Sequence, residues 1–84
     1  MNSVALFRSD DDKALITIAD NDTNIALIAK DAKFHIGTGS TDYENFTVWP
    51  TEKRVGINTT TPGKSLEVIG EVSASSTGSF EFLT

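Results

Sequence analysis

The sequence predicts an all-β fold made of short strands that repeat along the chain. Its residues lean toward Thr, Ser, Val, Ile and Asn, and little Leu or Glu stands in helical register. Short stretches of alternating or β-branched apolar residues end at turn-forming residues. A strand–turn–strand pattern also recurs about every twenty residues, which is typical of repeat architectures.

The first two expected strands are residues 14–18 and 25–29. The first reads Ala-Leu-Ile-Thr-Ile, a β-branched run, and the second reads Ile-Ala-Leu-Ile-Ala. Residues 20–24 between them read Asp-Asn-Asp-Thr-Asn and favour a turn. A helix over residues 25–34, capped by Asn24, is the alternative. The preceding β-run and the turn cluster favour a hairpin instead.

Five further strands are expected where apolar residues alternate with polar ones: 33–36, 45–49, 53–57, 65–72 and 80–83. Turn residues separate these segments. Gly37 to Ser40 follow the first of them, and Pro50 ends the second. Asn58 to Gly63 follow the third, where Pro62 presets its own backbone dihedral and Gly63 is permissive.

The repeat is visible in two pairs of segments. Phe34–Thr38 aligns with Val55–Thr59, and Phe46–Val48 aligns with Leu66–Val68. Apolar centres recur about every ten residues along the chain. Residues 32–72 are therefore interpreted as two strand–turn–strand fibre repeats.

Two other regions flank the repeats. Residues 1–31 form an N-terminal β/turn region, which is a candidate attachment segment. Residues 73–84 form a Ser- and Gly-rich connector and the start of a further strand.

Each expected strand carries a single apolar stripe, because side chains alternate between the two faces of a strand. One stripe per strand cannot enclose a core within one chain. Apolar burial would contribute about 120 kcal/mol. Ordering the 84 residues would cost roughly 125 kcal/mol, which cancels the contribution of apolar burial. We therefore expect further copies of the chain, and three parallel chains around a common axis would enclose a core. The expected core residues are Ile36, Phe46, Val48, Val55, Ile57, Leu66 and Val68.

Composition argues against several classes of protein. The sequence has no Cys and one His, which excludes disulfides, thiolate metal sites and a His cluster within one chain. A net charge of -5 argues against nucleic-acid binding, which needs a basic patch. No apolar run approaches the length of a membrane span, and the first residues lack the features of a signal peptide.

The stretch from Val55 to Ser75 carries the most distinctive motif, Val-Gly-Ile-Asn-Thr-Thr-Thr-Pro-Gly-Lys-Ser-Leu-Glu-Val-Ile-Gly-Glu-Val-Ser-Ala-Ser. It resembles a module of bacteriophage tail fibres and tailspikes, which often reads Val-Gly-Ile-Gly-Thr-Thr-x-Pro-x-x-Lys-Leu-x-Val-x-Gly and often precedes an endosialidase-type intramolecular chaperone. The clear resemblance covers about a quarter of the chain, and residues 34–40 resemble a degenerate copy. Asn58 stands where the family usually has Gly, and asparagine is the next-best residue for a left-handed backbone position.

The resemblance implies a non-enzymatic component of the virion. Its fold would be an intertwined parallel homotrimeric β-fibre, similar to a triple β-helix or β-prism, and it would form a shaft segment of the host-adhesion apparatus. Its partners would be two further copies of the chain, neighbouring virion proteins and host surface polysaccharide. The alternative is a small receptor-binding tip or a capsid-attached head fibre that binds host surface glycans. A bacterial trimeric adhesin is a third interpretation, but it needs an export signal.

Two aromatic residues are candidate glycan or partner contacts. Tyr43 and Trp49 lie close together in the sequence, and aromatic rings can stack on sugars. Packing between subunits is the alternative, and we favour it for Trp49. Phe46 and Val48 share a face of their strand, so Trp49 falls on the other face or in a bend at Pro50.

The remaining polar clusters do not predict a site. Asp20–Asn24 places oxygen ligands at alternate positions, but Ile25 stands where a calcium loop needs Gly, so we expect a solvated turn. Asp10–Asp12 is expected to be an exposed loop. His35 points away from the face that its neighbours share, which favours a surface or intersubunit hydrogen bond over metal binding. No nucleophile elbow, carboxylate pair in a cleft or phosphate loop is evident, so we expect no catalytic residue, cofactor or metal.

Overall fold

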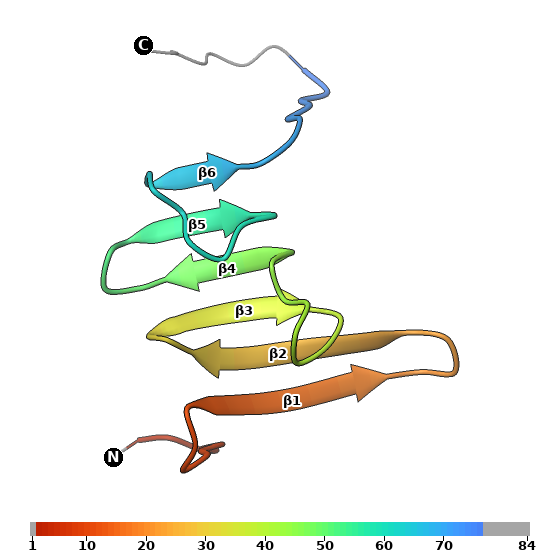
Figure 1. Ribbon diagram of the computed structural model, residues 1–84, viewed down its shortest axis with the longest axis vertical. Helices are drawn as coiled ribbons and strands as arrows, with labels where there is room; N and C mark the ends of the chain where they lie inside the picture. Colours follow the sequence, from red (N-terminus) through yellow and green to blue (C-terminus); the bar gives the residue numbers. More distant parts are fainter. Residues whose placement is uncertain (1, 77–84) are drawn as a thin grey trace.

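The computed structural model describes residues 2–76, which form one six-stranded sheet and no helix (Figure 1). The all-β prediction is confirmed. The expected strand at residues 80–83 lies outside the described residues. The strands are β1 (Lys13–Ala19), β2 (Asn24–Lys30), β3 (Lys33–Gly37), β4 (Phe46–Trp49), β5 (Arg54–Ile57) and β6 (Leu66–Val68).

The strands lie side by side in the order in which they occur in the sequence (Figure 1). Neighbours are antiparallel from β1 to β5, and β5 and β6 are parallel. Asp31 and Ala32 join β2 to β3 with φ values of 56° and 64°, and the type I′ turn of a two-residue hairpin has positive φ at both positions. The expected hairpin of the first two strands is confirmed, because β1 pairs with β2 along its whole length. The alternative helix over residues 25–34 is wrong.

The expected strand over residues 65–72 is wrong in its length. β6 ends at Val68, and the next residue, Ile69, donates its N–H to the carbonyl of Ile57 at 3.0 Å. Gly70 then adopts a φ of 138°, which L residues rarely adopt, and no strand follows it within the described residues. The second repeat thus ends in a short parallel pair, whereas the first ends in an antiparallel pair.

The sheet runs across the expected boundary between residues 1–31 and 32–72. β2 lies before that boundary and β3 after it, and the two strands pair from Ala26 with Gly37 to Lys30 with Lys33. Residues before and after the boundary therefore belong to one continuous sheet.

The strand register sorts the side chains onto two different faces. Directly paired residues of neighbouring strands share a face, and successive residues of a strand alternate between faces. One face, which we call the apolar face, carries only apolar side chains. They are Ala14, Ile16, Ile18, Ile25, Leu27, Ala29, Phe34, Ile36, Phe46, Val48, Val55, Ile57, Leu66 and Val68.

The opposite face, called the polar face below, is covered by two loops of the chain itself. Residues 38–45, between β3 and β4, form the first loop, which crosses in front of the sheet in Figure 1. It approaches Gly37 so closely that a Cβ atom there would collide with the backbone of Asp42. Lys13 of β1 holds this loop in place, because its Nζ donates a hydrogen bond to the carbonyl of Ser40 at 2.6 Å.

Residues 58–65, between β5 and β6, form the second loop over the polar face. Its closest approach is at Gly56, where a Cβ atom would lie 2.8 Å from the Cγ2 of Thr59 and 3.3 Å from the Cβ of Pro62. Arg54 adds a hydrogen bond from its Nη1 to the carbonyl of Pro62 at 3.4 Å. Pro62 is thereby fully buried.

The small core of the chain lies between the polar face and these loops. Ile28 is 1% exposed and Thr47 is 0% exposed, whereas Ile18 and Leu66 on the apolar face are 57% and 63% exposed. The chain therefore buries its more polar face and leaves its apolar face open.

Gly37→Ala is expected to lower the thermal stability of the protein, because the added methyl group must displace the loop at residues 38–45. Overpacking of this kind costs about 1–3 kcal/mol. Gly39→Ala is the matched control, because a Cβ atom there would meet nothing within 4 Å. Thermal unfolding of both variants at one protein concentration checks the prediction. Equal melting temperatures for the two variants would contradict the close approach at Gly37.

Candidate assembly surface

The seven core residues expected from the sequence all lie on the apolar face. They come from β3 to β6 and form one contiguous surface, because their strands pair in register. None of the seven is buried within the chain, and Ile57 and Leu66 are 37% and 63% exposed. Because large contiguous apolar surfaces are typical of sites that interact with other molecules, this surface is the candidate functional site.

The apolar face extends further than the expected core list. β1 and β2 add Ile16, Ile18 and Ile25, which are all exposed, and Leu27, which is half-buried. The sequence contains the signal for this extension, because residues 14–18 and 25–29 both have the pattern of a strand. Their stripes belong to the same face because β2 pairs with both β1 and β3.

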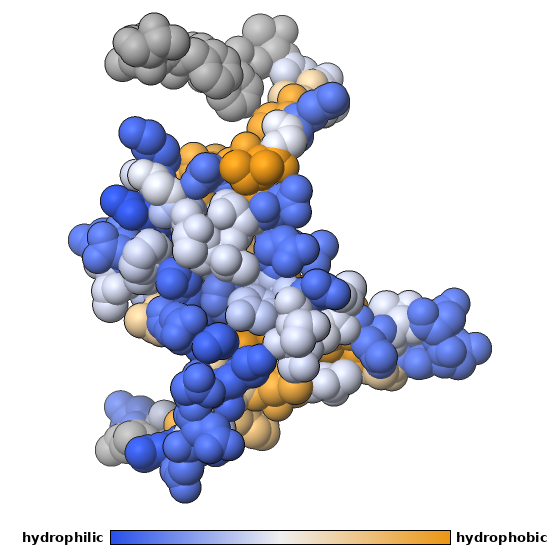
Figure 2. Space-filling model, in the orientation of Figure 1, coloured by the Kyte–Doolittle hydropathy of each residue, from blue (hydrophilic) through white to orange (hydrophobic). Residues whose placement is uncertain are grey.

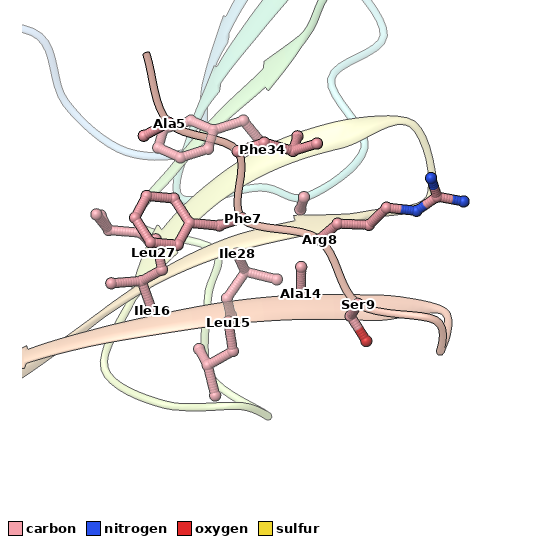
Figure 3. Close-up of a pocket in the computed structure, with 12 residues that line it drawn as sticks. Ala5, Phe7, Arg8, Ser9, Ala14, Leu15, Ile16, Leu27, Ile28 and Phe34 are labelled. Carbon is pink, nitrogen blue, oxygen red and sulfur yellow. The ribbon is translucent and has the colours of Figure 1, made fainter. Parts of the chain in front are cut away.

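Residues 4–9, which we call the N-terminal arm, lie over part of the apolar face (Figure 3). A cavity of about 660 Å³ lies between the arm and strands β1 to β3. Phe7 reaches over Leu27 and Ile16 in Figure 3, and Phe34 also lines the cavity. The arm therefore covers the part of the apolar face on β1 to β3 without filling the space beneath it.

The polar face has a different character (Figure 2). Hydrophilic and neutral residues occupy most of the surface on the side of the two covering loops. Beneath them His35 is 2% exposed, and its Nδ1 lies 3.0 Å from the Oγ1 of Thr47 in a hydrogen bond. The ring of Tyr43 lies against His35 with the ring centroids 4.8 Å apart. The hydrogen bond of His35, expected at the surface or between subunits, is instead buried within the chain, where the loop that carries Tyr43 packs onto the imidazole.

The two candidate glycan contacts, Tyr43 and Trp49, are both engaged by side chains of their own chain. Lys13 Nζ lies 5.6 Å from the ring centroid of Tyr43. Lys33 Nζ lies 4.3 Å and the Arg54 guanidinium 5.7 Å from the ring of Trp49, at cation–π distances. Trp49 falls on the face opposite to Phe46 and Val48, as the alternation of the strand predicts.

In the acidic turn between β1 and β2, carboxylate oxygens accept hydrogen bonds from residues of the same turn. The backbone N–H of Asp22 donates to Oδ1 of Asp20 at 3.1 Å, and Thr23 Oγ1 lies 3.1 Å from Oδ1 of Asp22. The first of these bonds is the main reason that the pKa of Asp20 lies below its ordinary value. In the other acidic cluster Asp12 lies 3.6 Å from Lys30 Nζ. Within residues 2–76 no group of three or more acidic or His side chains is placed to hold a metal ion.

No match is found when the chain is compared with protein-family models and with curated protein sequences. In the part of the chain that the structure describes, no helix is long and apolar enough to cross a membrane. The uncovered apolar face is consequently the feature from which the function is inferred.

The stability of the protein is expected to fall as the pH is lowered below about 6.5. Burial first, and then the positive charge of Lys33, hold the pKa of His35 below its ordinary value of 6.5. The folded state therefore favours the neutral imidazole, and its stability is complete above pH 6.5. Stability is lost as the pH falls from there through the lower pKa of the folded protein.

Two measurements check this pH dependence. The single His of the chain gives one imidazole signal by NMR, and its titration midpoint in the folded protein should lie below 6.5. Urea unfolding between pH 7.5 and 5.5 should show a loss of stability that is reduced in the His35→Gln variant. A midpoint at or above 6.5 would refute the burial of the neutral ring.

Proposed function

We propose that the chain is a structural, non-enzymatic segment of a bacteriophage tail fibre or tailspike, in which three parallel copies form a β-structured shaft. One observation carries the proposal: the sheet covers its polar face with its own loops, whereas its wholly apolar face is overlaid only in part, by the N-terminal arm. The chain would then act in the virion by extending or joining the host-adhesion apparatus.

Layer packing supports the trimeric arrangement. A sheet that is apolar on one face needs a second layer over that face, and the two loops of this chain cover the opposite, polar face. Three sheets whose apolar faces point at a common axis form a closed prism, and each sheet supplies part of the covering of the other two. The covering loops at residues 38–45 and 58–65 would then lie on the outside of the shaft.

The fibre-like motif supports the assignment to a phage shaft. It comprises β5, the loop at residues 58–65 and β6, which together build the last part of the sheet. Asn58 has a φ of 64°, a left-handed conformation that glycine adopts readily, and it stands where the modules that the motif resembles usually have Gly. Its side chain also donates to the carbonyl of Ile69 at 3.1 Å, which holds the chain beside β5 as it leaves β6.

Glycan binding by a receptor-binding tip has less support than the shaft. The rings of Tyr43 and Trp49 are the candidate sugar contacts, and side chains of the same molecule already lie against both. A structural role needs no free aromatic ring, so these contacts are compatible with it.

The mass of the folded protein tests the proposal. Native mass spectrometry is expected to give three times the 9.0 kDa mass of the chain. Ile57→Asp and Ile18→Asp should both yield monomers, because a carboxylate enclosed by apolar side chains costs several kcal/mol. Both positions are exposed in the single chain, at 37% and 57%, so the sheet itself should survive.

Thr17→Asp is the matched control, because Thr17 is exposed beside Ile18 on the opposite face of β1. It should retain the mass of the trimer. Circular dichroism of each variant should show that β-structure is kept. A monomeric wild-type protein with an intact sheet would rule out the trimeric shaft.

A further inference from the structure

The N-terminal arm carries more apolar surface than its own sheet covers. Leu6 is 68% exposed and its neighbour Phe7 is 72% exposed, and Val4 is completely exposed. Because Leu6 and Phe7 are adjacent and both largely exposed, part of the apolar surface of the arm faces away from its own sheet.

The arm is held by little within its own chain. Among the described residues, no hydrogen bond or ion pair involves residues 4–8. The arm joins β1 through a polar turn, in which the N–H of Asp11 donates to Oγ of Ser9 at 3.0 Å. The cavity of about 660 Å³ beneath the arm is lined by Leu27 and Phe34, among others, and no side chain of residues 2–76 fills it. The contacts within residues 2–76 thus leave the cavity empty and much of the apolar surface of the arm exposed.

The size of the apolar face also calls for a contribution from the arm. Six strands about 4.8 Å apart, averaging about five residues at about 3.3 Å each, outline roughly 480 Å². A stable interface buries about 800 Å² on each partner, and in a trimer the sheet surface is divided between two neighbours. Phe7 at 72% exposure offers about 110–180 Å² more. Burial of the arm between copies therefore adds apolar area to an interface for which the sheet surface alone is too small.

We propose that the N-terminal arm is an intersubunit layer, held between the apolar face of its own chain and that of a neighbouring copy. This inference rests on the proposed trimer with inward apolar faces. Cyclic symmetry brings the same level of each chain together, so the arm meets strands β1 to β3 of its neighbour. Leu6 then lies against the neighbour's apolar face near the position of Leu27.

A disulfide between two different chains tests this contact directly. The sequence contains no Cys, so introduced cysteines are the only thiols present. Leu6→Cys and Leu27→Cys proteins, one of them carrying a mass tag, are refolded together and treated with a mild oxidant. A mixed disulfide dimer on a non-reducing gel is the expected product. Thr17→Cys replaces Leu27→Cys in the control mixture, because Thr17 lies on the opposite face of the sheet and should give no mixed dimer.

A second measurement does not depend on thiol geometry. Leu6→Asp is expected to raise the chain concentration at which half of the protein is trimeric by about tenfold or more, since a buried Leu contributes about 1.5–3 kcal/mol. Ser3→Asp, an exposed position just before the arm, should leave that concentration unchanged.

The outcomes separate the arm from the trimer itself. A mixed dimer together with a weakened Leu6→Asp assembly supports the intersubunit arm. If Ile57→Asp gives monomers while Leu6→Asp assembles normally and no mixed dimer forms, the trimer stands and the arm does not bridge its copies. A wild-type protein that is monomeric overturns both proposals.

Discussion

The structure depends on the regular alternation of apolar and other side chains along each strand. This alternation places the apolar stripe of every strand on the same side of the sheet. Because pairing is in register across all six strands, the separate stripes add up to a single continuous surface. A shift of one residue in any strand would send its stripe to the wrong face. The alternation therefore fixes the strand register and the exposure of the apolar face together.

The polar face shows how a sheet with so small an apolar interior is still held together. His35 and Thr47 face each other across β3 and β4 and share a hydrogen bond between Nδ1 and Oγ1. Within residues 2–76 no buried side-chain nitrogen or oxygen lacks a hydrogen-bond partner. Complete satisfaction matters here because an unpaired buried polar group costs about 1–3 kcal/mol. The loops that cover this face are thus structural parts of the fold.

Local patterns predicted the strands well and the chain's path between them poorly. Ala14 to Ile18 and Phe46 to Val48 alternate so clearly that their strand state and their shared face follow from the sequence. The burial of His35 did not follow, because it depends on a loop whose path is set by a close approach at Gly37, far from any periodic signal. The direction of β6 was missed for a similar reason. Two loops of the same length, at residues 38–45 and 58–65, return the chain in opposite senses, and the sequence repeat does not distinguish them.

The parallel step between β5 and β6 has a geometric consequence for the route of the chain. Six strands that all reversed direction would bring the chain back to the lateral margin of the sheet where β1 starts. One step without reversal changes that parity, so β6 runs in the same direction as β1 and ends at the opposite margin (Figure 1). The chain thus traverses the sheet diagonally, from one corner to the corner across from it. In a prism of three such sheets, each chain would pass from one vertical edge of its face to the next, which gives the assembly a sense of rotation about its axis.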